Sequence, residues 1–435
     1  MKPLVCAALL VAAAAVPRAV AAQSLALEPQ TTTPAPATGQ GSKEKDRDRF
    51  VFTSRPSLRF GSALRIDFRL KLQGDFRTFD DAVTEEDGFE FNRKRVGIQG
   101  HFLKYFEYEL ERELREDNVW RDVFLNFTYF DNYQVRGGKF KMPFGLEELT
   151  GPTDLDFVYR TNVSENLTPA REIGVALHGQ FHRRAFGYEV GVFDGDGEDE
   201  DARLERGGEN VERTIAARVT GRPLRRAGLP ANAGELTLGF AVTSGTVPEG
   251  LNSLRVRTAF RQRFDDPVFV DGRRLRLGLE ADWQPGPFSV KAEFIRASDE
   301  RKNQGIQLED LPAAVAQGWY VSGSWIVTGE SKFGGIEPRR PLLRGGAGAV
   351  EVATRYERLG FGSSSGGDNE STSPRGPNLL ETSDGAWTAG VNWYVNRWTK
   401  IQLNVIREWI EDANRSPVPD RHLFWTRVVR LQFVL

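Results

Sequence analysis

The chain has 435 residues, and its 58 basic side chains nearly balance its 60 acidic ones, giving a formal net charge of −2. This balance gives no support to nucleic acid as a partner, and we expect none. The single cysteine, Cys6, lies in the first segment of the chain, so we expect neither disulfides nor thiol chemistry in the mature protein.

Residues 1–22 have the features of a cleaved export signal. Met1-Lys2 gives a positive start, Val5 to Val16 is apolar, and small residues precede Gln23. The apolar run is too short for a spanning helix. We therefore expect a signal peptide over 1–22, followed by a disordered leader over 23–49 because that segment combines a Pro/Thr/Gly-rich run with a charge run.

From residue 50 onward the sequence alternates with a period of two. Leu64 to Leu72 carries apolar residues at the even-numbered positions and charged residues at all the odd-numbered ones. The alternation continues for about ten residues, which is the length of a tilted membrane strand rather than of a soluble one. No stretch after residue 22 contains the run of about 18 apolar residues that a membrane helix needs.

The same pattern recurs along the chain and predicts sixteen strands. An even number is typical of single-chain bacterial barrels. We place the strands at 63–76, 89–101, 104–115, 119–130, 133–141, 172–182, 186–193, 212–221, 235–244, 273–284, 287–297, 318–329, 347–358, 386–396, 399–410 and 422–435.

The connections alternate between tight turns and long loops, as in a barrel with short turns on the periplasmic side and long loops outside. Two segments, 222–234 and 330–346, should be short and are not. An extra strand pair within 251–272 would raise the count to eighteen.

Aromatic residues near the predicted strand ends and an alternating C-terminal strand agree with a membrane barrel. The predicted fold is an all-β, transmembrane antiparallel barrel over 50–435, located in the bacterial outer membrane and in contact with its lipid and lipopolysaccharide. A soluble all-β sandwich is the structural alternative, although it would not need 10-residue alternation throughout.

Arginine exceeds lysine by 46 to 12. Alternation places many arginines opposite the apolar stripe, which in a barrel is the lumen. Arginine stays charged and offers a planar fork of donors to oxyanions such as phosphate. The lumen is therefore a candidate path for small anions, although carboxylates share the same face and could neutralise it.

The sequence gives little support for an enzymatic function. The four histidines have no nearby serine motif, no phosphate-binding or dinucleotide motif occurs, and we expect no catalytic residue, metal site or cofactor. The acidic run Asp194–Asp201 lacks the spacing of a calcium-binding EF-hand loop, which favours a solvated outer loop over weak divalent-cation binding. A structural barrel without a pore is a further alternative.

Several segments together resemble the phosphate-selective porin O/P family. Gly138–Glu147 reads GKFKMPFGLE, and REIGV follows at 171–175. Further segments match in order: FNRKRVGIQG, GVFDGDG followed by AARVTGRP, GWYVSGSWIVTGE, AVEVATRYERLG and WTAGVNWYVN. The resemblance spans roughly 60–435 and implies a 16-stranded trimeric barrel whose third outer loop, here 142–171, folds inward and narrows the pore.

We therefore expect a porin for passive diffusion of small hydrophilic solutes that prefers anions such as phosphate, assembled as a homotrimer. A general porin with a mixed-charge constriction is the main alternative. The candidate pore-lining residues are Arg93, Arg95, Arg136, Arg160 and Arg171, followed by Arg65, Arg69, Lys71 and Arg218.

Overall fold

The computed structural model describes residues 49–80, 87–115, 119–197, 212–226, 234–254, 256–366, 379–412 and 421–435, and the single residues 373, 414, 416 and 418. The predicted signal peptide lies outside the described residues. So does the predicted leader, apart from Arg49.

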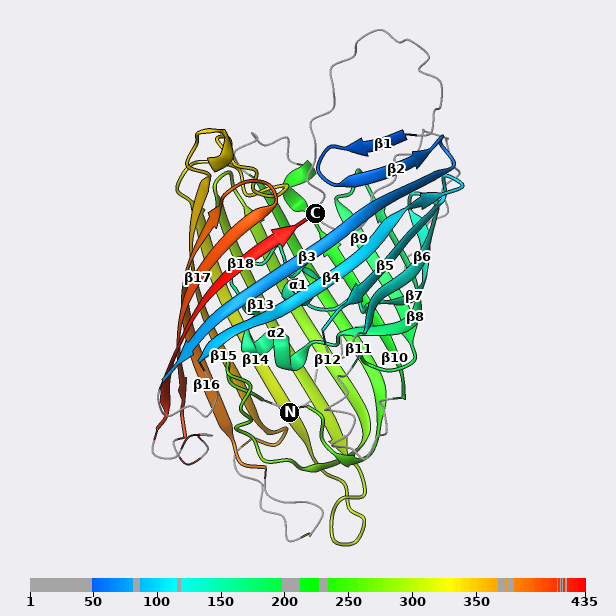
Figure 1. The fold of residues 1–435 in the computed structure, drawn as a ribbon. Helices are drawn as coiled ribbons and strands as arrows, with labels where there is room; N and C mark the ends of the chain where they lie inside the picture. The colour runs from blue at the N-terminus through cyan, green and yellow to red at the C-terminus, as the bar shows by residue number, and fades with distance from the viewer. Residues whose placement is uncertain are drawn as a thin grey trace.

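Sixteen antiparallel strands form one closed barrel (Figure 1). Each strand from β3 to β17 pairs with the next, and β18 pairs with β3, for example through Gln432 opposite Gln73, which closes the sheet. The strands are β3 (Leu64–Phe79), β4 (Gly88–Phe102), β5 (Phe106–Glu113), β6 (Trp120–Phe130), β7 (Tyr133–Lys141), β8 (Arg171–Phe181), β9 (Phe186–Phe193), β10 (Glu212–Gly221), β11 (Glu235–Leu251), β12 (Phe269–Gln284), β13 (Phe288–Arg301), β14 (Leu311–Ile326), β15 (Ala349–Ser363), β16 (Thr382–Tyr394), β17 (Thr399–Ile410) and β18 (Leu423–Val434).

The prediction of a sixteen-stranded barrel is confirmed, and each predicted strand corresponds to one barrel strand. The barrel does not gain a strand pair from 251–272, because residues 252–268 leave the sheet. Two further strands, β1 (Arg49–Phe52) and β2 (Pro56–Phe60), were not predicted; they form a hairpin that pairs with the start of β3 and lies at the rim of the barrel (Figure 1).

Alternation sorts the side chains between the two faces of the sheet. On β8, Ile173 and Val175 expose 58% and 57% of their surface on the outside, whereas Ala176 and His178 expose 1% and 4% on the inside. Successive side chains of a strand point to opposite faces, so the apolar set meets lipid and the polar set lines the lumen. No helix among the described residues is long and apolar enough to cross a membrane.

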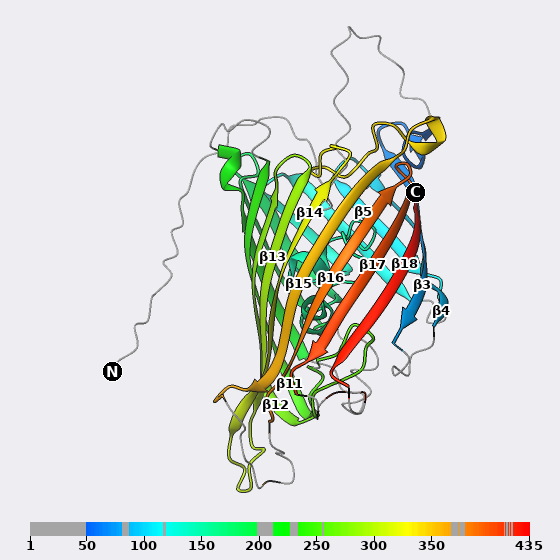
Figure 2. The ribbon, with the colours of Figure 1, turned by 90° about the vertical axis from the view of Figure 1, so that its left-hand side faces the viewer.

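The two ends of the barrel differ. Tight turns lie at the end that carries the C-terminus, and Leu103 and Gly286 adopt the left-handed backbone conformation there (φ 47° and 59°). We call this the short-turn end and the opposite one the long-loop end. The two connections that are longer than expected also lie at the short-turn end. They contain the short 3₁₀ turns η1 (Pro223–Arg226) and η3 (Leu342–Arg344) (Figure 2).

The connection between β7 and β8, residues 142–170, lies inside the barrel, and we call it L3 (Figures 1 and 2). It contains two short helices, α1 (Leu146–Leu149) and α2 (Asn162–Leu167). The Thr161 side chain caps α2 by accepting a hydrogen bond from the Ser164 N–H.

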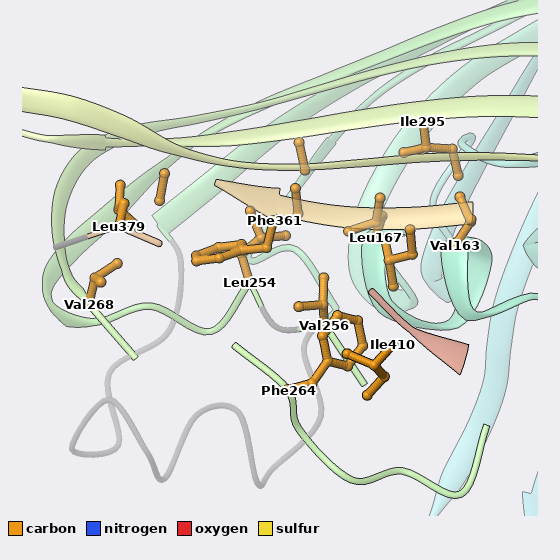
Figure 3. Close-up of a cluster of buried hydrophobic side chains, with 14 of the residues drawn as sticks. Val163, Leu167, Leu254, Val256, Phe264, Val268, Ile295, Phe361, Leu379 and Ile410 are labelled. Atoms are coloured by element: carbon orange, nitrogen blue, oxygen red, sulfur yellow. The ribbon is translucent and has the colours of Figure 1, made fainter. Parts of the chain in front are cut away.

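A second connection also enters the barrel: residues 252–268, between β11 and β12, which we call L5. Leu254, Val256 and Phe264 of L5 are nearly fully buried in a cluster that also contains Val163 and Leu167 of α2 (Figure 3). Inward apolar residues of the wall, such as Ile295 and Phe361, complete this cluster near the long-loop end. Apolar packing therefore fills part of a lumen that is otherwise polar.

Candidate functional site

L3 is held to the wall formed by β13–β18 through its backbone. The Val158 N–H donates to Asn404 Oδ1 (2.7 Å), and the Val158 carbonyl accepts from Arg430 (2.7 Å). Lys400 Nζ donates to the carbonyls of Thr153 (2.9 Å) and Leu155 (3.1 Å). These wall side chains satisfy backbone groups that a buried loop would otherwise leave without partners.

Ion pairs strengthen the same attachment. Arg355 of β15 lies 3.2 Å from Glu147 of L3, and Lys291 of β13 lies 2.9 Å from Asp156 of L3. Lys332, from the long segment at the short-turn end, reaches Asp156 at 2.5 Å. Burial alone would raise the pKa of the Asp156 carboxyl, but these two ammonium groups outweigh it and hold that pKa below its usual value. L3 is therefore fixed by ion pairs in which basic residues outside the loop neutralise the loop's carboxylates.

Carboxylates of the wall also hold the start of α2. The Asn162 N–H donates to Glu357 (2.5 Å), and the Asn162 side-chain amide donates to Asp384 and Glu408 (2.8 Å each). Glu408 accepts from the Ala259 N–H of L5 as well (3.0 Å). One group of acidic residues therefore attaches both inward loops.

The other side of L3 faces the wall formed by β3–β8, where basic residues gather. Arg93 of β4 has Arg95, Arg160 and Arg430 among its strongest electrostatic neighbours, which places it opposite L3. We call this group the eyelet cluster. Its basic members are Arg69, Lys71, Arg93, Arg95, Arg121, Lys141, Arg160 and Arg171, and its acidic members are Glu109, Glu111, Glu113, Asp122 and Glu148.

Most of the predicted cations in the eyelet cluster are ion-paired. Lys71 lies 2.8 Å from Glu111, which also takes Arg95 at 3.3 Å. Arg171 forms a bidentate pair with Asp122, with contacts of 2.9 to 3.1 Å. Arg69 pairs with Glu109, and Arg95 also pairs with Glu113 at 2.7 Å. These carboxylates neutralise part of the positive charge that the sequence predicted for the lumen.

Two arginines of the cluster have no such partner. Arg93 donates to Gln73 Oε1 (2.7 Å), and no ion pair joins it to a carboxylate within the described part of the chain. Arg121 has a buried Nε without a hydrogen-bond partner, and the described residues give it no ion pair. Both side chains are half-buried.

Arg160 belongs to L3 itself. It lies 3.1 Å from Glu148 and donates to the carbonyls of Glu147 (3.1 Å) and Thr150 (3.2 Å). Burial would raise the pKa of the Glu148 carboxyl, but Arg160, Lys141 and Arg171 together lower it below its usual value. Glu148 is therefore a carboxylate at neutral pH, and Arg160 also shapes the loop.

Three predicted residues lie away from the eyelet cluster. Arg136 stacks over Phe124 and Phe140, at 5.1 and 5.2 Å, and lies 3.5 Å from Glu189. Arg218 pairs with Glu280 at 2.5 Å and lines a hollow of about 470 Å³ at the short-turn end. Arg65 is 41% exposed and pairs with Asp67 at 2.7 Å. The prediction named them with the eyelet residues because alternation gives the face of a residue but not its height in the lumen.

The acidic run 194–201 differs in part from the solvated loop that we predicted. Asp196 is buried and lies 2.9 Å from both Arg274 and Arg276 of β12. Burial would raise the pKa of the Asp196 carboxyl, and these two arginines lower it below its usual value instead. Residues 198–201 lie outside the described residues. The run therefore turns inward at Asp196, which pairs with two lumen arginines.

Sequence reasoning missed Arg121 and Lys141. Arg121 sits at an irregularity in the pairing of β5 with β6, between the pairs Leu110–Val123 and Arg112–Trp120, so simple alternation does not place it in the lumen. Lys141 ends β7, where its Nζ lies 3.6 Å from Glu148. Its position within the GKFKMPFGLE segment was the only available signal.

Comparison with known proteins gives a match over most of the chain. A family model described as phosphate-selective porin O and P matches residues 65–435. Porin O of Pseudomonas aeruginosa strain PAO1 is 25% identical over 406 residues, which cover 84% of this chain and 87% of that protein.

Solved structures share the fold. The trimer form of OmpT from Vibrio cholerae aligns with a TM-score of 0.53 at 11% identity, covering 86% of this chain and 100% of that one. The outer-membrane channel DcaP of Acinetobacter baumannii aligns with a TM-score of 0.52 at 9% identity, covering 86% and 98%. At such identities the likeness concerns the fold alone.

Proposed function

Because this chain belongs to the phosphate-selective porin O and P family, it is an outer-membrane porin, and we propose that its pore prefers small anions, with phosphate and related oxyanions among them. Small hydrophilic solutes would pass by diffusion between L3 and the β3–β8 wall. Porin O of Pseudomonas aeruginosa, a relative over most of the chain, supports the assignment to a pore.

The observation that carries the anion preference is the charge of the eyelet cluster. Basic members outnumber acidic ones, and Arg93 and Arg121 remain without an ion pair among the described residues. Two unit charges 4 Å apart interact by about 1 kcal/mol in bulk water and about 4 kcal/mol at an effective dielectric constant of 20. Fixed charge therefore selects where L3 narrows the path and much less in a wide vestibule.

The ion pairs of the same cluster suit a conducting pore. A solute anion that meets Arg95 or Arg171 competes with Glu113 or Asp122, so it is held weakly and leaves again. Conduction requires binding that is favourable enough for entry and weak enough for release. Arg93 and Arg121 would attract the anion, and the paired residues would pass it on.

A general porin with a mixed-charge constriction is the second candidate. The favouring observation is that Glu111, Glu113, Asp122 and Glu148 lie in the same cluster as the arginines. Opposed charges of this kind produce a transverse field rather than a net anion filter. The two candidates differ in the sign and size of the reversal potential in a salt gradient.

The test is a planar-bilayer measurement on the wild type and on Arg93→Gln/Arg121→Gln. We expect an anion-selective wild type, and a permeability ratio that falls in the double variant by on the order of tenfold, about 1.4 kcal/mol. Arg65→Gln, at the short-turn rim, is the control and should behave like the wild type. A cation-selective wild type, or a double variant equal to it, would leave the general porin.

We propose that the porin assembles as a homotrimer, supported by its family membership and by the trimer form described for the Vibrio cholerae structure of the same fold. Native mass measurement of the purified protein in mild detergent should give three copies per particle. A particle that remains a single copy at all protein concentrations would contradict this.

A further inference from the structure

The outer face of β17 and β18 carries two arginines near the long-loop end. Arg407 and Arg427 are both exposed, while their chain neighbours Ile406, Glu408 and Val428 are buried on the lumen side. Alternation therefore turns both guanidinium groups outward, to the side that meets lipid.

The strand register makes these two arginines neighbours. Arg407 pairs with Trp425, and Arg427 pairs with Val405, so the arginines are diagonal partners roughly 7–8 Å apart, with a somewhat shorter distance between their Cβ atoms. The Arg407 guanidinium lies over the Trp425 ring, 5.7 Å from its centroid. In the part of the chain that the structure describes, no ion pair joins either arginine to a carboxylate.

The carboxylates closest along these strands are already engaged. Glu411 pairs with Arg358 at 2.5 Å, and Asp80 accepts the Trp425 backbone N–H at 2.8 Å. Two like charges at a lipid-facing surface repel each other and are costly unless an anion lies between them. Among the described residues, no carboxylate takes that place.

Aromatic residues place the arginines at the level of the lipid headgroups. Trp319, Tyr356 and Trp409 form a row on the same outer wall, with ring centroids 5.5 and 6.0 Å apart. Tryptophan and tyrosine gather where hydrocarbon meets water, and the long-loop end faces outward. The arginines thus lie at the outer leaflet.

The surface next to the arginines, toward the short-turn end, is aliphatic. Leu403, Val429 and Leu431 expose 46%, 40% and 56% of their surface on the lipid side. A ligand at this place would meet positive charge at one end and apolar surface along the rest. Guanidinium groups bind phosphate through charge-assisted hydrogen bonds.

We propose that Arg407 and Arg427, with Trp425 between them, bind the phosphorylated headgroup of an outer-leaflet glycolipid, lipopolysaccharide, whose acyl chains lie along Leu403, Val429 and Leu431. The amphipathic shape of the surface favours a lipid over free phosphate, because inorganic phosphate would use only the charged end.

The test is native mass spectrometry of the full-length porin, titrated in detergent with bisphosphorylated lipid A. The wild type should retain bound lipid A. Arg407→Gln/Arg427→Gln should bind it on the order of thirtyfold more weakly, because a basic residue near an anionic membrane surface contributes about a factor of five. Arg407→Lys/Arg427→Lys keeps both charges and should keep most of the binding.

Arg296→Gln is the matched control, because Arg296 is an outward arginine of β13 that donates to Gln317 (3.2 Å) and has no arginine partner of this kind. It should bind lipid A like the wild type. Dephosphorylated lipid A provides a test on the wild type itself and should bind as weakly as the glutamine variant does to lipid A.

Three outcomes would overturn the proposal. Equal binding of lipid A by the glutamine variant and the wild type would show that the arginines do not hold it. Displacement of lipid A by an equal concentration of inorganic phosphate would identify a free-anion site. Loss of oligomer with unchanged lipid binding would identify a contact between copies of this chain.

Discussion

In the half of the lumen formed by β13–β18, opposite charges meet and cancel: Glu147 meets Arg355, and Asp156 meets Lys291 and Lys332. In the half formed by β3–β8, basic residues exceed acidic ones, and Arg93 and Arg121 have no ion pair among the described residues. Basic and acidic residues therefore have different roles in the two halves of the lumen. One wall pairs its charges with those of L3, and the other pairs most of its charges within the wall itself.

The comparison teaches that arginine on the lumen face does not by itself mark a selective pore. Arg355 and Arg430 bind backbone carbonyls of L3, while Arg274 and Arg276 bind Asp196. These residues shape the interior, and the eyelet cluster uses the space that they leave.

Removing L3 should have the largest effect on the difference between the two halves of the lumen. Deleting 150–165 removes the first four of the six residues of α2 and most of the segment anchored to β13–β18, so both halves of the lumen become open. We expect single-channel conductance to rise roughly twofold or more, since flux through a watery pore follows its width. An unchanged conductance in a correctly inserted deletion variant would show that L3 does not limit the path.

Arg355→Gln should loosen L3 on the β13–β18 wall without removing it, because the contacts of Val158, Asp156 and Lys400 remain. Glu147 and Glu357, 3.2 and 3.1 Å from the guanidinium, would lose their buried counter-charge, at a cost of about 3–5 kcal/mol. We expect a noisier single-channel current and a lower temperature of barrel unfolding on heating.

Arg218→Gln is the control for this variant. It also removes a lumen arginine from its carboxylate, Glu280, but lies away from L3. It should leave the current noise unchanged. Equal noise in the two variants would contradict a specific role of Arg355 in holding L3.

Leu254→Ala should weaken the apolar cluster formed by L5, α2 and the barrel wall. The Leu254 side chain is 2% exposed within the apolar cluster that contains residues of L5, α2 and the wall, and truncation of a buried leucine costs about 2–5 kcal/mol. Because the polar anchors of L3 remain, we expect a lower unfolding temperature with a smaller change in conductance. Leu403→Ala, on the lipid-facing surface, should lower the unfolding temperature less; the reverse order would argue against an internal apolar core.

Acidification should have the smallest effect. The pKa of Asp156 is lowered on folding, so its ion pairs contribute their full stability above the unfolded pKa of about 4 and lose it only as pH falls through the lower folded value. Asp156 should therefore cause no step in conductance between pH 8 and pH 5. A step within this range would mean that another group controls the position of L3.

The sequence by itself determined the barrel. Side-chain direction alternates along every strand, so the run from Leu64 to Leu72 already assigns one face to lipid and the other to the lumen. The count of sixteen strands and the placement of the tight turns followed from the same local rule, and L3 was recognised from a resemblance over 138–147 and 171–175.

Only the tertiary structure decided which charges cancel. The pair Glu147–Arg355 joins residues 208 positions apart, and Asp196 reaches β12 from a segment that resembled a solvated loop. L5 also turned inward instead of adding strands, because its apolar residues found a partner in α2. Alternation is a property of neighbouring residues in one strand, whereas the height of an arginine in the lumen and the carboxylate it meets depend on strand register and loop packing across the whole barrel.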